Sequence, residues 1–197
     1  MKITKIVAQQ KNKDRVSIYI DGKYIFSLNL NQLLEFHLKS GSEINEIDLE
    51  KYKKLSQDGK LKQRALEWLL IRPHSARELH DYLKRKKLDD EAINIWVQEF
   101  QSKNYQNDYD FTEWWIEQRQ SKKHSSLSIK HELKTKGVSD EIINQKLNDS
   151  ALNDKEILIN LIAKKRQQSK YLDDKKLIEY LMRQGFRYSL IKEVLAE

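Results

Sequence analysis

Cationic side chains are unevenly distributed along this 197-residue chain, and their pattern is the feature with the clearest chemical potential. Nine Lys and Arg residues stand against three acids between Lys60 and Lys87, and six cations stand against one glutamate between Arg119 and Lys136. The intervening residues 88–118 carry eight acids and one lysine. Such basic segments would suit phosphates or an acidic groove on a protein partner. The alternative is an ordinary solvated helix face.

The candidate binding residues lie on these two basic segments. Arginines are favoured among them, because a planar guanidinium grips a phosphate or carboxylate with two hydrogen bonds. The candidates for contact with a partner or with DNA are Arg72, Arg77, Lys84, Arg85, Lys86, Arg119, Lys122, Lys123, Lys130, Lys134 and Lys136.

Other residue types give no sign of catalysis. The chain has no cysteine, which excludes thiol chemistry, Cys-ligated zinc and a disulfide framework. Its five histidines lack zinc-ligand spacing, and no P-loop or nucleophile elbow is present. The acids at Asp89–Glu91 and Asp173–Asp174 are typical of helix starts. We therefore expect a protein that is not an enzyme, with no catalytic residues, metal or cofactor.

The four tryptophans have two interpretations. Trp68, Trp96, Trp114 and Trp115 could stack on nucleic-acid bases. Three of them lie on apolar helical stripes, which favours core packing. Trp114 and Trp115 are adjacent and cannot both point inward, so one is expected to cover a neighbouring module or a partner.

The elements that carry these residues form a repeat. Apolar residues, helix caps and a turn recur in phase after 50 and then 48 residues, which indicates tandem helical modules. The matched apolar positions are Leu79, Ile129 and Leu177; Leu83, Leu133 and Leu181; Leu88, Val138 and Phe186; Ile93, Ile143 and Ile191; and Val97, Leu147 and Leu195.

The predicted caps of the central helices are Ser75, Ser125 and Asp173, and Ser75 with Glu78 has the spacing of a capping box. The turn after each central helix carries Lys87, Gly137 or Gly185, where a left-handed residue is often required. Much of 121–125 is expected to be an exposed loop.

The first part of the chain has a different pattern. Residues 3–8 predict a strand, and alternation over 16–20 and 23–28 around Asp21-Gly22 predicts a β-hairpin with a type I′ turn. Tyr24, Phe26 and Leu28 are expected on one face. A helix over 30–36 should follow, and then another that Asp48 caps and that Gly59 interrupts.

These observations predict a mainly α fold, with tandem three-helix repeats in an elongated array after a small N-terminal β-rich domain. The high charged content and single proline suit long helices. The predicted domains are 1–58, a β-rich domain with a helix, and the helical repeats 59–108, 109–153 and 154–197. No apolar run reaches the roughly 18 residues of a membrane span, so we expect a cytoplasmic protein with no membrane partner.

The sequence resembles the RecX family of regulatory proteins from about residue 60 onward. The likeness lies in Arg72-Pro73-x-Ser75-x-x-Glu78-Leu79 after a helix with Ala65, Leu66 and Leu69, then in Trp115 and Arg119, and then in Ile129-Lys130-x-Glu132-Leu133-x-x-Lys136-Gly137-Val138. The first 50 residues look like the β-rich extension of some family members. His74, Lys87 and the loop 121–124 depart from the usual pattern.

The resemblance implies three tandem three-helix modules in an elongated curved array. It also implies a monomeric regulator that binds the RecA recombinase–single-stranded DNA filament, lies in its groove and restrains its ATPase and strand exchange. This hypothesis places the chain in homologous recombination, DNA repair and the SOS response. The alternative is a sequence-independent nucleic-acid-binding protein with helix-turn-helix-like modules. A third possibility is a scaffold whose charges only keep it in solution.

Overall fold

The computed structural model describes residues 1–10, 12–150 and 153–196. The chain forms two compact units, residues 1–68 and 69–197, which we describe separately. Within the described ranges, no helix is both long and apolar enough to cross a membrane.

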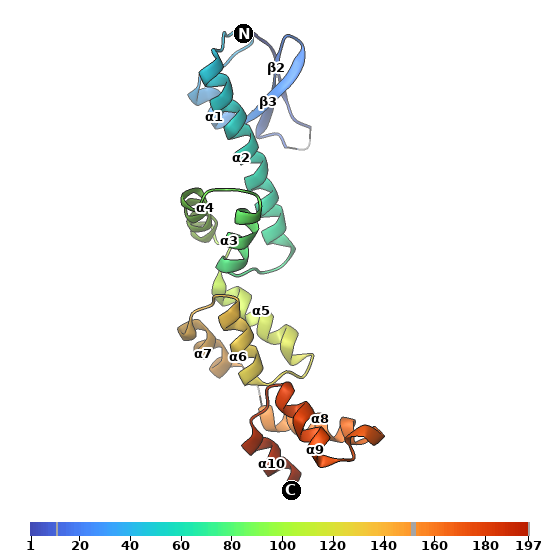
Figure 1. The fold of residues 1–197 in the computed structure, drawn as a ribbon. Coiled ribbons are helices and arrows are strands. Elements are labelled where there is room, and N and C mark those ends of the chain that lie inside the picture. Colours follow the sequence, from blue (N-terminus) through green and yellow to red (C-terminus); the bar gives the residue numbers. More distant parts are fainter. Residues whose placement is uncertain (11, 151–152, 197) are drawn as a thin grey trace. The chain divides into compact units, whose positions relative to one another are not determined.

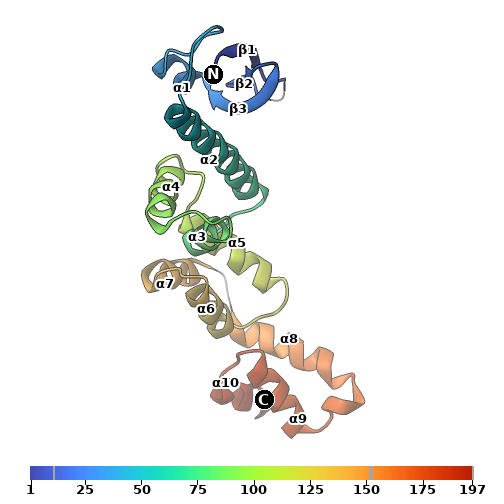
Figure 2. The same cartoon turned by 45° about the horizontal axis from the view of Figure 1, so that its top comes forward.

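The first unit contains a three-stranded antiparallel sheet of β1 (Ile3–Ala8), β2 (Arg15–Ile20) and β3 (Lys23–Asn29), in that order (Figure 2). The tight turn between β2 and β3 consists of Asp21 and Gly22, with φ of 50° and 76°. Two successive positive φ angles define a type I′ turn, which matches the twist of the flanking strands. The predicted strands and hairpin are therefore confirmed.

One detail of the hairpin prediction is wrong. Phe26 and Leu28 enter the core as expected, but Tyr24 is 43% exposed. The register between β2 and β3 shifts because Ile18 pairs with Phe26 whereas the next residue, Tyr19, pairs with Tyr24. This bulge inserts one extra residue into β3 and turns Tyr24 away from the core.

Two helices follow the sheet: α1 (Leu30–Glu35) and α2 (Glu46–Ile71). Asn45 rather than Asp48 caps α2, because its side chain accepts the amide hydrogen of Asp48 at 2.8 Å. The expected break at Gly59 is absent, and α2 continues through it. Leu49 and Tyr52 of α2 pack into the same core as Phe26.

The second unit is helical among its described residues (Figure 1). Its helices are α3 (Ala76–Arg85), α4 (Asp90–Ser102), α5 (Asp108–Gln120), α6 (Ser126–Thr135), α7 (Asp140–Asp149), α8 (Asp154–Arg166), the 3-10 turn η1 (Ser169–Tyr171), α9 (Asp174–Arg183) and α10 (Tyr188–Ala196). We call the repeats that contain α3–α4, α5–α7 and α8–α10 modules one, two and three. The prediction of a mainly α fold with three-helix repeats is confirmed.

The predicted repeat positions form the module cores. Nine side chains are completely buried. They are Leu79, Leu83 and Ile93 in module one, Ile129, Leu133 and Ile143 in module two, and Leu177, Leu181 and Ile191 in module three. Equal burial at equal positions shows that the apolar period in the sequence corresponds to a repeated packing unit.

The helix boundaries also repeat. Ser75, Ser125 and Asp173 cap α3, α6 and α9 as predicted, each accepting a backbone amide hydrogen. The turns after these helices hold Lys87, Gly137 and Gly185 at φ of 64°, 80° and 87°, which confirms the need for a left-handed residue. In the loop before α6, residues 121–123 are exposed as expected, whereas Ser125 is buried.

Candidate interaction surface

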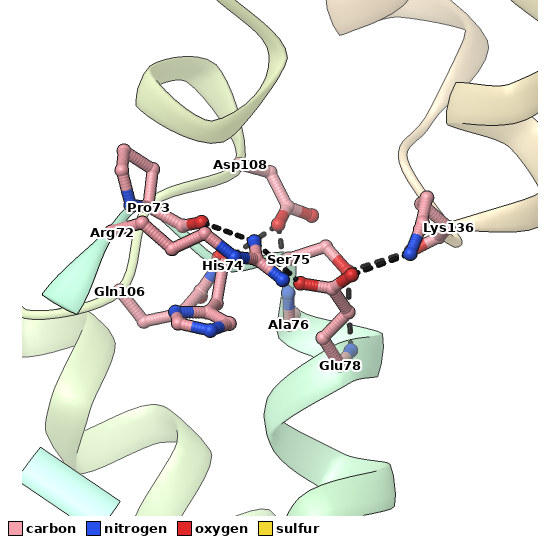
Figure 3. A network of polar contacts seen from close by, with 9 residues as sticks. All are labelled: Arg72, Pro73, His74, Ser75, Ala76, Glu78, Gln106, Asp108 and Lys136. Carbon is pink, nitrogen blue, oxygen red and sulfur yellow. Dashed lines mark hydrogen bonds and ion pairs between the residues drawn. The ribbon is translucent and has the colours of Figure 1, made fainter. Parts of the chain in front are cut away.

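A carboxylate between two of the predicted cations joins modules one and two (Figure 3). Glu78 of α3 lies with Oε2 3.0 Å from Arg72 Nη1 and Oε1 2.6 Å from Lys136 Nζ. The predicted capping box at Ser75 is therefore only half formed. Ser75 accepts the Glu78 amide hydrogen at 3.1 Å, but the Glu78 side chain is turned toward the two cations.

The environment of this junction shifts two titratable groups. Burial would raise the pKa of Glu78, but hydrogen bonds and Coulombic attraction from Lys136 and Arg72 outweigh burial and lower that pKa. The neighbouring His74 side chain is buried, and burial followed by repulsion from Arg72 lowers its pKa to about 4. The junction therefore holds an ionised carboxylate beside a neutral imidazole near neutral pH.

Two tryptophans of α5 bind the cations of the same region. The Arg72 guanidinium lies 4.9 Å from the Trp114 ring centre, which brings a residue before α3 onto module two. Arg119 and Lys136 lie 4.4 Å and 4.9 Å from the ring centre of Trp115. Cation–π contacts of this kind contribute about 0.5–2 kcal/mol each.

Glu132 of α6 completes the cluster around Trp115. Its Oε2 atom accepts hydrogen bonds from Trp115 Nε1 at 2.9 Å and from Arg119 Nε at 2.5 Å. Arg119, like Arg72 and Lys136, therefore has an internal carboxylate partner. The structure brings these three predicted residues together around two tryptophans and two glutamates rather than in an open row.

A hydroxyl-to-carbonyl contact also joins successive modules, and it occurs twice. The Ser75 hydroxyl donates to the main-chain oxygen of Lys136 at 2.8 Å, and the Ser125 hydroxyl donates to that of Gln184 at 3.2 Å. In each case a helix cap contacts the turn after the central helix of the next module. The same two serines also cap their own helices, so one side chain does both tasks.

An aspartate gives the reciprocal contact. Asp108, the first residue of α5, accepts the amide hydrogen of Ala76 at 2.8 Å, and Asp154 of α8 accepts that of Ser126 at 2.8 Å. These amides are unpaired donors of helix N-termini, which a carboxylate satisfies well. We call the two serine bonds and the two aspartate bonds the module interlock. It fixes module one to module two, and module two to module three, in the same way.

The sequence carries a signal for the interlock that the apolar repeat did not reveal. Asn107-Asp108 and Asn153-Asp154 are the same dipeptide at equivalent places. In both copies the asparagine caps its own helix. The aspartate is thereby free to reach the preceding module. The partners Glu78 and Glu132 had no comparable signal, because single glutamates on basic helices are common.

The remaining predicted cations lie at exposed positions, except for the half-buried Lys130. Lys84 pairs with Asp90 at 3.2 Å, Lys134 pairs with Asp140 at 2.8 Å, and Lys130 contacts Asn144. Lys86 lies over the Tyr82 ring. Within the part of the chain that the structure describes, six of the predicted residues form no ion pair with a carboxylate: Arg77, Arg85, Lys86, Lys122, Lys123 and Lys130.

Module three adds cations that the sequence reasoning did not consider. Lys165 lies 4.6 Å from the ring centre of Tyr180 and 5.4 Å from that of Tyr171, and Lys170 lies 5.6 Å from the latter. Lys164 on the same helical segment is exposed. The sequence itself carries the signal for this group, since Lys164, Lys165 and Lys170 lie close together beyond Lys136.

The third helices of modules one and two are acidic. α4 begins with Asp90 and Glu91, and α7 begins with Asp140 and Glu141, all of them exposed. In a helix-turn-helix protein this is the helix that enters the DNA groove. Carboxylates at its start would repel phosphates, so these modules do not have the charge pattern of helix-turn-helix readers.

Comparison with known families finds matches along most of the chain. Residues 1–45 match the N-terminal domain of regulatory protein RecX, residues 62–97 match the first three-helix domain of RecX, and residues 107–147 match the second three-helix domain. These limits agree with the β-rich region and the first two helical repeats.

Curated relatives and solved structures agree with these matches. Regulatory protein RecX of Bacillus licheniformis is 31% identical, with 99% of this chain and 76% of the relative covered. The Bacillus pumilus protein is 32% identical with the same coverage. A crystal structure of a regulatory protein RecX has a TM-score of 0.75 at 23% identity and covers 100% of this chain and 99% of its own. RecX from Lactobacillus salivarius has a TM-score of 0.59 at 20% identity, covering 70% of this chain and 94% of its own.

Proposed function

The chain belongs to the RecX family of regulatory proteins, and from this premise we propose that it regulates the RecA recombinase. In this proposal it binds in the groove of the RecA–single-stranded DNA filament and mostly inhibits ATP hydrolysis and strand exchange. Catalysis belongs to the recombinase, and this protein biases the state of the filament. Its setting is recombination and DNA repair in the cytoplasm.

The observation that carries the proposal is the module interlock. A protein that binds along the groove of a filament contacts it at several successive places, so its own contact points must keep a fixed spacing. The Ser75–Lys136 and Ser125–Gln184 bonds hold consecutive modules in one repeated relationship. Preorganisation of this kind reduces the entropy lost on binding.

We assign different tasks to the predicted cations. Arg72, Arg119 and Lys136 are engaged with Glu78 and Glu132, so we propose that they hold modules one and two together. The proposed contacts to the filament are the other predicted cations of the two modules, all exposed except for the half-buried Lys130. They are Arg77, Lys84, Arg85, Lys86, Lys122, Lys123, Lys130 and Lys134.

Ion pairs between exposed lysines and carboxylates do not prevent these lysines from contacting the filament. Lys84–Asp90 and Lys134–Asp140 are surface pairs, which contribute about 0–1 kcal/mol and exchange readily for a phosphate or a partner carboxylate. If a cation that pairs with Glu78 turned to the filament instead, the half-buried Glu78 carboxylate would lose a partner, which would cost more free energy.

We propose 1–58 as a β-rich domain and 59–108, 109–153 and 154–197 as the functional repeats.

The test is a titration of RecA on single-stranded DNA at fixed moderate salt, with both ATPase rate and DNA-bound recombinase measured. Suppression at substoichiometric protein would support a filament regulator, because coating of free DNA needs stoichiometric amounts. Suppression only at DNA saturation would overturn the proposal in favour of a competing nucleic-acid binder. Phosphate-dominated binding would also lose about 10³–10⁵ in affinity between about 50 and 200 mM salt.

A further inference from the structure

A buried arginine in the first unit lies where the sheet meets α2. Arg15, at the start of β2, is 9% exposed. Its Nη2 atom donates to Ser27 Oγ at 3.0 Å, to the Ser27 main-chain oxygen at 3.3 Å and to the Ser56 main-chain oxygen at 3.5 Å. Ser27 is on β3 and Ser56 is on α2, so the guanidinium spans the line along which these elements meet. We call this line the β3–α2 seam.

The seam is the reason for the glycine inside α2. A Cβ atom on Gly59 would stand 2.4 Å from Arg15 Nη1, closer than real Cβ atoms come. Glycine inside a helix costs about 0.5–1 kcal/mol relative to alanine. The helix accepts this cost at the residue that the guanidinium touches, so the space for Arg15 is built into the fold.

The guanidinium of Arg15 has hydrogen-bond acceptors, but no negative charge neutralises it. Its three acceptors are hydroxyl and carbonyl oxygens, which satisfy N–H groups but carry no full charge. Among the described residues, no carboxylate forms an ion pair with Arg15 or with Lys60. Burial penalises this uncompensated charge, and desolvation lowers the pKa of Arg15.

A second cation and a phenol extend the seam to the surface. Lys60 of α2 donates to the hydroxyl of Tyr24 at 2.9 Å, and its ammonium lies 5.2 Å from the centre of that ring. Burial would raise the pKa of Tyr24. Side-chain hydrogen bonds with Lys60, Ser27 and Ser56, together with the charge of Lys60, outweigh burial and lower that pKa. Tyr24 faces this seam because of the bulge in β3, which turns it away from the core.

We propose that the β3–α2 seam binds a phosphate of a single-stranded nucleic-acid backbone through Lys60, Tyr24 and Arg15. Two cations, a phenolic hydroxyl and two serine hydroxyls converge there with no acid among their partners. The two serine hydroxyls are buried and hold Arg15 and each other. A phosphate would supply the missing negative charge and accept from Lys60, Tyr24 and Arg15. This inference deepens the proposed function, since it gives the β-rich domain a direct contact with the DNA strand.

The first experiment uses the full chain and inorganic phosphate. Phosphate should raise the thermal midpoint more than chloride at equal ionic strength, because a ligand of the folded state adds stability as its concentration exceeds Kd. Lys60→Gln should remove most of this difference. Lys54→Gln, which removes an exposed cation elsewhere on α2, should retain it. Equal midpoints in phosphate and chloride would overturn the site, as would equal loss in both variants.

The second experiment separates a nucleic acid from free phosphate. Binding of a labelled oligothymidylate is measured without recombinase over a range of salt concentrations. Lys60→Gln and Tyr24→Phe should weaken binding about two- to tenfold, and Lys60→Gln should lower the salt slope by about 0.7, the value for one single-strand phosphate contact. An unchanged slope, with phosphate stabilisation intact in the wild type, would overturn the nucleic-acid assignment and leave free phosphate as the ligand. Because no RecA is present, failure here differs from failure of the ATPase titration.

Discussion

Gly137 lies so close to Arg77 that a Cβ atom added to the glycine would stand 2.9 Å from the Cβ and Cδ atoms of the arginine. Gly185 has the same relationship to Ser128, at 2.7 Å. Both glycines occupy turns on which the preceding module packs through the interlock. The equivalent turn in module one holds Lys87, which is exposed and keeps φ of 64°. Glycine is thus required where a module docks, and a side chain is tolerated where the turn faces solvent.

The glycine rule predicts opposite effects at two equivalent turns. Gly137→Ala should lower the free energy of unfolding by about 2 kcal/mol, because it adds left-handed backbone strain to a steric clash with Arg77. Lys87→Gly should be neutral or stabilising by up to about 1 kcal/mol, because it only relieves strain. Urea denaturation followed by circular dichroism measures both. Equal destabilisation by the two variants would contradict the docking explanation.

The aspartate of the interlock should contribute measurably to stability. Asp108→Ala removes the acceptor of the Ala76 amide and of Gln106 Nε2, and should cost about 1–2 kcal/mol. Asp110→Ala is the matched control, because Asp110 is exposed on the same helix. The free energies of unfolding of the two variants are to be compared. A cost at Asp110 as large as that at Asp108 would mean that helix charge, not the interlock, sets the effect.

Apolar periodicity predicted the modules well because each module must bury the same face. Leu79, Ile129 and Leu177 are equally buried, and the serine caps follow from backbone donors that every helix start exposes. The same local logic predicted the hairpin from Asp21-Gly22, since few other residues accept two positive φ angles.

Contacts between residues far apart in the sequence could not be predicted from these local patterns. Glycine usually weakens a helix, so Gly59 predicted a break, and only the position of Arg15 explains why α2 continues. Similarly, Arg72 and Lys136 lie in basic segments that suggest a binding surface, but in the fold both pair with Glu78. Charge in a sequence identifies which residues are cations; it does not identify which of them already have a partner in the fold.

The division of the cations can be tested by comparing binding with stability. Replacing Arg85, Lys122 and Lys123 together by Gln should weaken binding to the RecA–DNA filament about tenfold or more, with the free energy of unfolding unchanged within about 0.5 kcal/mol. Arg72→Gln should instead lower the free energy of unfolding by about 1–2 kcal/mol, because it breaks the ion pair with Glu78 and the contact with Trp114. Fluorescence anisotropy on preformed filaments and urea denaturation give the two readouts. Loss of filament binding in a fully stable Arg72→Gln protein would show that Arg72 is itself a contact.

The buried imidazole at the junction predicts a specific pH dependence. The pKa of His74 falls from 6.5 to about 4 on folding, so the unfolded chain binds more protons between these values. The free energy of unfolding should therefore decrease as pH falls from about 6.5 to about 4, by up to about 3 kcal/mol. Glu78 has a lowered pKa and loses its contribution only as pH falls below its ordinary value of 4.5, so the interval from about 4.5 to 6.5 isolates the histidine.

Two variants separate His74 from the other histidines. His74→Gln should flatten the pH dependence between about 4.5 and 6.5, whatever its effect on absolute stability, because no titrating group remains at that position. His131→Gln, at an exposed site on α6, should retain the wild-type slope. Urea denaturation at closely spaced pH values gives both slopes. A wild-type slope in His74→Gln would mean that the imidazole charges freely in the folded state and that the junction does not exclude a third cation beside Arg72 and Lys136.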